Sequence, residues 1–137
     1  MWSDTLLTAE RAQLLRLTIW SALSIVTGTS ILALLAVRRL RSALLSGFAF
    51  QMLGWGIALI AWCGISLHAL APRDLAAATR LQRLVWMASG LDLGIIGIGL
   101  TLAIATRQRG VGVGIAVQGA ALLVLDVGFM QIISRLV

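Results

Sequence analysis

Four long apolar stretches, separated by short segments that hold most of the charged residues, form the main pattern of this chain. A run of about 20 apolar residues is long enough to cross a bilayer as an α-helix. The pattern therefore predicts four membrane-spanning helices, at about residues 17–37, 45–70, 84–106 and 111–133. Short connections make consecutive helices antiparallel neighbours. We predict an all-α fold, a transmembrane four-helix bundle with up-down-up-down topology, in which residues 1–137 form a single integral membrane domain.

Polar residues near the ends of the stretches predict where the helices begin and end. The first 16 residues are expected to form a short interfacial helix that continues into the first span, with Thr8 as its N-cap. Their acidic residues argue against a cleaved signal peptide. Pro72 is expected to end the second helix, and Asp74 to cap the third.

Glycines inside the stretches predict how the helices pack, because small residues let helix backbones approach closely in a membrane. On the third predicted helix, Gly90, Gly94 and Gly97 form one ridge and Asp92 lies almost opposite. We therefore expect this helix to have two protein-facing sides, and a spare side could contact a second copy of the chain. The candidate packing positions are Gly47, Gly54, Gly90, Gly94, Gly97, Gly112 and Gly119.

The composition supports a membrane protein over a soluble one. Only 12% of the residues are charged, whereas soluble domains carry about 25%. The net charge of +6 comes from eleven arginines, with no lysine. Basic charge beside apolar spans serves topology and anionic lipid headgroups, so we expect the lipid bilayer as a partner and no nucleic acid. Arginines flank the stretches on both predicted sides, which leaves the orientation open. Cys63 is interpreted as an inert, packed thiol.

Asp92 and Asp126 are the most informative polar residues, because an aspartate at the centre of a membrane helix costs roughly 2.5–3.5 kcal/mol on insertion scales. Both are displaced from the midpoints of their spans by about 4–6 Å towards the same membrane face. We expect the two side chains to lie at similar depth, facing each other or a shared cavity. The favoured interpretation is a hydrogen-bonded clip between helices. A proton relay or transport site and a ligand-binding site are the alternatives.

Three further polar residues lie within or at the ends of the stretches. The amides of Gln51 and Gln118 are expected to form hydrogen bonds between helices. His68 lies near the end of its span, at interfacial depth, and a single histidine cannot supply a bis-histidine haem. No cofactor or metal is expected, and no catalytic motif is found, so we expect no enzymatic activity. The tryptophans are assigned to interfacial anchoring (Trp2, Trp20 and Trp86) or to packing (Trp55 and Trp62).

Three segments carry a family resemblance: FAFQMLGW at 48–55, GLDLG at 90–94 and QGAALLVLD at 118–126. Together they resemble an uncharacterised family of bacterial four-span integral membrane proteins, known only as a domain of unknown function. The family pattern has asparagines beside the Gln-Met and Trp positions, where this chain has Leu53 and Gly56. The resemblance implies a multi-pass protein of the bacterial inner membrane, and it implies no activity.

Three functions are compatible with this sequence. The favoured one is a scaffold that associates with itself or with other membrane proteins through its small-residue ridges. The second is a small oligomeric transporter or channel that uses Asp92 and Asp126 as proton or substrate sites. The third is a bundle that binds a lipid or an apolar small molecule, with the buried acids as orienting groups.

Overall fold

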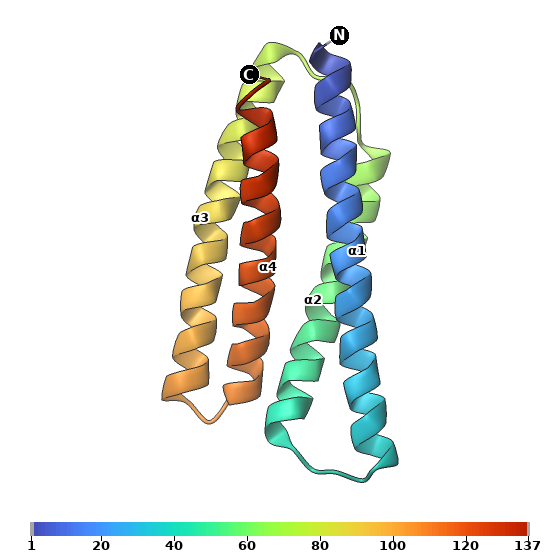
Figure 1. The fold of residues 1–137 in the computed structure, drawn as a ribbon, viewed down its shortest axis with the longest axis vertical. Helices are drawn as coiled ribbons and strands as arrows, with labels where there is room; N and C mark the ends of the chain where they lie inside the picture. Colours follow the sequence, from blue (N-terminus) through green and yellow to red (C-terminus); the bar gives the residue numbers. More distant parts are fainter. Residues whose placement is uncertain (1, 137) are drawn as a thin grey trace.

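The computed structural model describes residues 2–136, and these form four α-helices without a β-strand. The helices are α1 (Trp2–Val37), α2 (Ala43–His68), α3 (Leu75–Ala105) and α4 (Arg109–Ile133). They run alternately up and down, so both termini lie at one end together with the α2–α3 connection (Figure 1). All four are long and apolar enough to cross a membrane. The predicted all-α four-helix bundle is confirmed.

The helix ends agree with the sequence signals only in part. Asp74 caps α3 as predicted, because its side chain accepts a hydrogen bond from the backbone N–H of Ala77 at 2.7 Å. Thr8 does not cap a helix. It lies inside α1, which is continuous from Trp2, and its hydroxyl donates to the carbonyl of Asp4 at 2.8 Å. The second helix ends at His68, ahead of Pro72.

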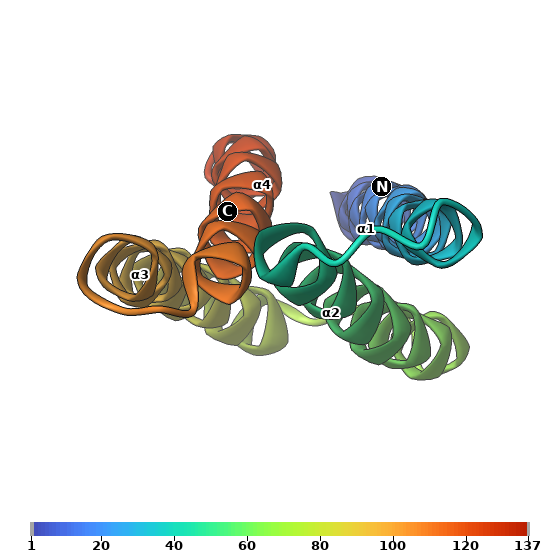
Figure 2. The same ribbon diagram turned by 90° about the horizontal axis from the view of Figure 1, so that it is seen from below.

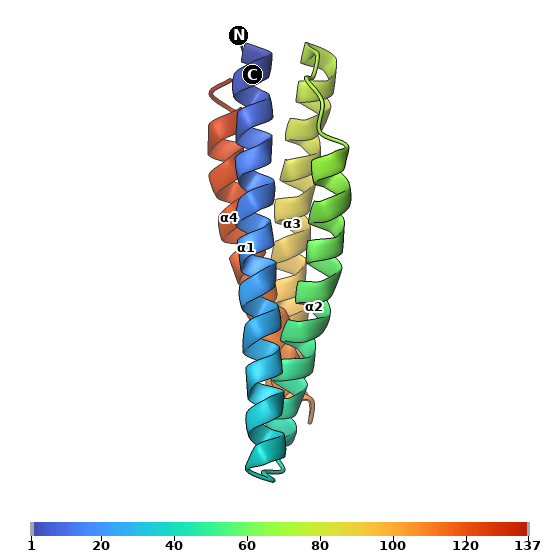
Figure 3. The same cartoon turned by 90° about the vertical axis from the view of Figure 1, so that its right-hand side faces the viewer.

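The four helices are arranged as two hairpins, α1–α2 and α3–α4, that meet along α4. Figures 2 and 3 show the hairpins side by side, with α4 next to both α1 and α2. Within residues 2–136, no Cα atom of α2 lies within 8 Å of a Cα atom of α3. The bundle is therefore not closed on all four sides.

Glycines permit the closest helix contacts. A Cβ atom added at Gly99 of α3 would lie 2.7 Å from the carbonyl oxygen of Gly112 on α4, and one at Gly119 would lie 3.1 Å from that of Asp92. Between α2 and α4, a Cβ at Gly47 would lie 3.2 Å from the backbone nitrogen of Val111. These contacts are backbone to backbone, so no larger residue fits without moving the helices apart.

Four of the candidate packing glycines instead face outward. No atom would lie within 4 Å of a Cβ added at any of them: Gly54, Gly90, Gly94 and Gly97. The expected packing role within the bundle does not apply to these positions, because they are on the far side of their helices from the neighbouring helix. A contact with a second copy stays a prediction. The opposite side of α3, with Asp92 and Gly99, is buried against α4.

The interior is rich in small and polar side chains, and many large apolar side chains face outward. Ser21, Ser24 and Gln118 are almost completely buried. Trp62, expected to pack inside, is 63% exposed, and Trp86 is 64% exposed. This distribution fits a lipid environment, because lipid tails solvate large apolar side chains and leave the helix contacts to small and polar residues. One apolar cluster lies at the end with the termini, around Leu6, Phe129 and Ile133.

Candidate functional site

Gln118 of α4 is the centre of a polar network that joins three helices. Its side-chain oxygen accepts a hydrogen bond from the indole N–H of Trp20 at 2.8 Å. Its side-chain nitrogen donates to the hydroxyl of Ser24 at 3.0 Å and lies 3.3 Å from the sulfur of Met52. The amide thus has partners on α1 and α2, and both kinds of polar atom are satisfied. The expected interhelical hydrogen bonds of Gln118 are confirmed.

Asp126 lies on the same helix as Gln118, nearer the C-terminus, and it forms a hydrogen bond with α1. The side-chain nitrogen of Gln13 donates to Oδ1 of Asp126 at 3.2 Å. Gln13 is only 4% exposed, and its Oε1 is buried without a hydrogen-bond partner. Because Nε2 donates to Asp126, Oε1 is the acceptor that remains available. Asp126 therefore forms the predicted kind of interhelical clip, although its partner was not anticipated.

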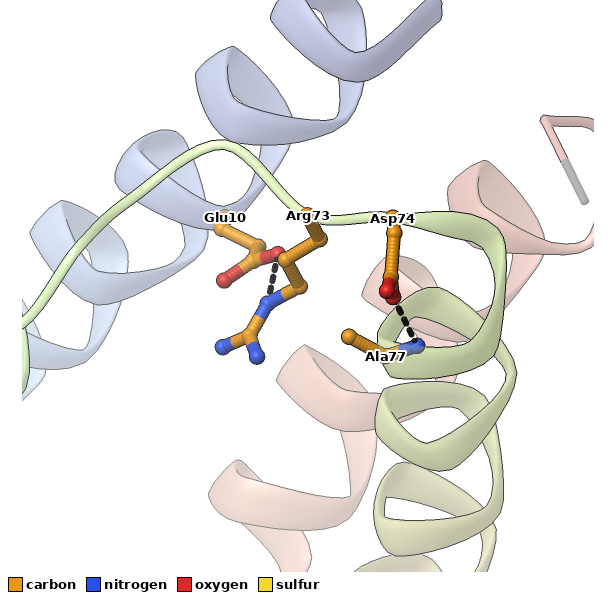
Figure 4. A network of polar contacts seen from close by, with 4 residues as sticks. All are labelled: Glu10, Arg73, Asp74 and Ala77. Carbon is orange, nitrogen blue, oxygen red and sulfur yellow. Dashed lines mark hydrogen bonds and ion pairs between the residues drawn. The ribbon is translucent and has the colours of Figure 1, made fainter.

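A salt bridge ties α1 to the α2–α3 connection. Nε of Arg73 donates to Oε1 of Glu10 at 2.7 Å, and the Glu10 side chain is 6% exposed against 37% for Arg73 (Figure 4). The neighbouring Asp74 accepts a hydrogen bond from the backbone N–H of Ala77 and so caps α3. Because the connection is short and held at α3 by this cap, the salt bridge fixes it beside α1.

These polar groups border a cavity of about 470 Å³ between the two hairpins, lined by all four helices and the α2–α3 connection. Glu10, Gln13, Arg73 and Asp126 supply its polar wall, together with Ser66. Most of the remaining lining is apolar. It includes Leu14, Leu17, Leu59, Leu70, Leu81, Val85, Ala88, Leu122 and Phe129. The cavity thus combines a charged, hydrogen-bonding end with a hydrocarbon-like body.

The cavity faces the gap between α2 and α3. Trp62 of α2 and Leu84 of α3 both line it, yet they are 63% and 61% exposed. Since α2 and α3 do not approach each other, these two side chains lie at its mouth. The mouth therefore lies at the side of the bundle, between α2 and α3.

Asp92 is buried elsewhere. It is 5% exposed, lies at the α3–α4 contact, and is absent from the lining of the cavity. Its Oδ2 is buried and has no hydrogen-bond partner among the described residues. Gly119 packs against the backbone of Asp92, and Asp126 follows Gly119 by seven residues. The backbones of the two acids are therefore offset along the helix axes by about 10 Å. The expected shared cavity and matching depth are not found.

Comparison with known proteins places the chain in a family. Residues 16–127 match a family of unknown function, DUF6992. The chain belongs to this family. No curated protein and no solved structure matches it. The matched region of this DUF6992 member contains Arg73, Asp92, Gln118 and Asp126, and it begins after Glu10 and Gln13.

The other predicted polar residues of this DUF6992 member lie outside the cavity. Gln51 is half-buried and contacts Gly114 of α4 through its aliphatic carbons. His68 is exposed at the end of α2. Cys63 is fully buried, in agreement with a packed thiol. Trp20, expected to be an interfacial anchor, is half-buried and donates a hydrogen bond to Gln118. The side chain of Trp2 lies outside the described residues.

Sequence reasoning missed Glu10 and Gln13, because the first 16 residues were expected to lie at the membrane interface, as a short helix that continues into the first span. A signal for them was present. The buried positions of α1 recur at intervals of three, four, seven or eight residues. They are Leu6, Glu10, Gln13, Ser21, Ser24, Gly28 and Leu35. The same face of a single continuous helix therefore contains both polar residues.

Proposed function

We propose that this protein is a multi-pass membrane protein that binds an amphiphilic small molecule or lipid in the cavity between its hairpins. The observation that carries the proposal is the cavity of about 470 Å³ with an apolar body and a polar end. Ligand sites in proteins are concave, predominantly apolar, and contain a few polar groups that orient the ligand. The cavity has this composition and a volume within the usual range of about 300–1,000 Å³.

The position of the cavity supports a ligand that arrives from the membrane. Its mouth at Trp62 and Leu84 faces the lipid, and its polar wall lies deeper, against α1 and α4. An amphiphile entering from the bilayer would place its apolar tail against the leucines and its head group against the polar wall. The proposed role is binding rather than catalysis, and it needs no cofactor.

A proton relay that uses both acids receives less support from this geometry. Asp126 borders the cavity and is bonded to Gln13, whereas Asp92 is enclosed at the α3–α4 contact. A relay needs a continuous chain of polar groups or water between its members, and no described side chain bridges these two carboxyl groups by a hydrogen bond.

Photolabelling tests the binding function directly. The protein, reconstituted in nanodiscs, is irradiated with a long-chain alcohol that carries a diazirine in its tail, and the labelled peptides are mapped by mass spectrometry. We expect saturable labelling of cavity residues such as Leu14, Leu59 and Leu122, which an excess of unlabelled alcohol suppresses. Ala88→Trp places an indole inside the cavity and should abolish this labelling.

The matched control is Ala61→Trp, because Ala61 is exposed on α2 and lines none of the cavities described. It should leave the labelling of Leu14 and Leu122 unchanged. Equal labelling of these residues in wild type and in Ala88→Trp would contradict the proposal.

We also propose self-association as a second function, on the basis of the outward ridge of α3. Gly90, Gly94 and Gly97 face away from α4 and contact no other helix. Glycines four residues apart on a lipid-facing surface permit a second helix to approach closely. This property supports the scaffold interpretation, with a second copy of the chain as the partner.

A further inference from the structure

The polar wall of the cavity contains two carboxyls, Glu10 and Asp126, and the amide of Gln13. Glu10, Gln13 and Asp126 contribute acceptor oxygens, and Arg73 is the only cation in the lining. Nε of Arg73 is committed to Glu10 at 2.7 Å. The charges of this pair offset each other, so the Asp126 carboxyl and the Gln13 amide oxygen determine what the wall recognises.

Gln13 shows that a donor is missing. Its Nε2 donates to Asp126, while its Oε1 is buried and unpartnered on a side chain that is only 4% exposed. A buried acceptor without a partner is unfavourable, and proteins satisfy nearly all such atoms. Gln13 lines the cavity, so a ligand in the cavity can supply the donor once the buried Oε1 turns towards it.

Given that the cavity binds an amphiphile, as proposed above, we infer that its ligand is a primary ammonium group on an apolar tail. An ammonium offers three N–H donors around one positive charge. It can donate to Oε1 of Gln13 and to the carboxyl of Asp126 at the same time, which a hydroxyl with one donor cannot. Its charge pairs with Asp126, and its tail lies along the apolar lining towards Trp62 and Leu84.

The head-group chemistry is the same whether the ammonium belongs to a free single-chain amine or to an aminophospholipid. A free amine would place its whole chain in the cavity. A phospholipid would insert its head group through the lateral mouth and leave its acyl chains in the bilayer. Both sources place the same head group against Gln13 and Asp126.

Native mass spectrometry of the purified protein tests the inference with decylamine, decanol and decanoate, which share one tail and differ in their head groups. We expect the wild-type protein to bind decylamine at least about tenfold more tightly than decanol or decanoate, because a charge-assisted hydrogen bond is stronger than a neutral one. Asp126→Asn and Gln13→Leu should each reduce this preference to within about threefold. Gln131→Leu, the same change as Gln13→Leu at an exposed site outside the cavity, should leave it unchanged.

Other results would contradict either the ammonium inference alone or the binding function as well. Equal binding of the three compounds, or preference for decanoate, would overturn the ammonium inference and leave the binding function intact. No binding of any compound, together with absence of cavity photolabelling, would overturn both. Circular dichroism checks that the variants are folded, and Gln13→Asn replaces Gln13→Leu if the latter does not fold. Retention of phosphatidylethanolamine over phosphatidylglycerol through purification would identify the source as a lipid, and decylamine binding without such retention would identify a free amine.

Discussion

At the scale of single residues, Gln118 takes part in most of the side-chain hydrogen bonds between helices among the described residues. It bonds to Trp20 and Ser24 on α1 and contacts Met52 on α2. Interhelical hydrogen bonds in membrane proteins contribute about 0.6 kcal/mol on average and up to about 2 kcal/mol each. We predict that Gln118→Leu lowers the free energy of unfolding by about 1–3 kcal/mol, measured by denaturation in mixed micelles. Gln131→Leu, the same change at an exposed site on α4, should have little effect, and equal effects would contradict the role of the network.

The Glu10–Arg73 pair predicts an unequal response to neutralising its two members. Glu10 is almost completely buried, whereas Arg73 is about one-third exposed. Arg73→Gln leaves a buried carboxylate without its partner and should cost about 2–4 kcal/mol of unfolding free energy. Glu10→Gln leaves an arginine that can reach water or lipid headgroups, and should cost about 1 kcal/mol or less. Unfolding of both variants and of the double variant measures the difference, and equal costs would contradict it.

The sequence identified some polar residues of the site and missed others for a physical reason. Asp126 and Gln118 are conspicuous because they interrupt apolar stretches, where a polar group needs a partner inside the protein. Glu10 and Gln13 lie among other polar residues near the N-terminus, where hydropathy gives no such contrast. Their role depends on α1 being one continuous helix and on how close α1 comes to α4. The local pattern predicts the continuous helix, but it does not show how close α1 comes to α4.

At the scale of helices, the α3–α4 contact depends on one face of α3. A Cβ at Gly99 would lie 2.7 Å from the carbonyl of Gly112, whereas one at Gly97 would meet open space. We predict that Gly99→Ala destabilises the protein by about 1–3 kcal/mol, because the two backbones must separate. Gly97→Ala should be neutral or stabilising, since alanine favours a helix over glycine by up to about 1 kcal/mol. Thermal unfolding of both variants measures the difference, and effects of the same sign and size would contradict this assignment of faces.

Hydropathy predicted the number and the approximate length of the helices. The sequence predicted only in part which side of each helix faces the rest of the bundle. The periodicity of small residues identified two ridges on α3 but could not show which one meets α4. A glycine permits a close helix contact in the same way within one bundle and between two chains, so the sequence does not distinguish the two kinds of contact. Only Asp92, with its high cost in lipid, distinguished the inner ridge. On α2 the two candidate packing glycines differ, because Gly47 meets α4 whereas Gly54 faces out.

At the scale of the whole molecule, the sequence predicted a bundle but not the division into two hairpins. Short connections define which helices follow one another as neighbours, and they carry no information on how closely the hairpins approach. The cavity exists because α2 contacts α4 near the Gly47 end, while α2 and α3 remain apart. Its polar wall combines residues from three separate parts of the chain, Glu10 with Gln13, Arg73 and Asp126. Such a site follows from the tertiary structure alone.

The outward face of α3 predicts how copies of the protein associate in the membrane. Gly90 and Gly94 are separated by one helical turn and have no neighbour within 4 Å of an added Cβ, so a second helix can pack there without displacing any part of the chain. Gly94→Leu should therefore weaken self-association by about tenfold or more and leave the fold intact, because leucine blocks the approach of two backbones. Fluorescence energy transfer between labelled copies in liposomes, followed over a range of protein-to-lipid ratios, measures the association. Gly64→Leu, at an open position on α2, is the control that should keep the wild-type transfer efficiency. Identical transfer curves for the two variants would mean that copies do not meet through this ridge, and the binding function of the cavity would stand independently of that result.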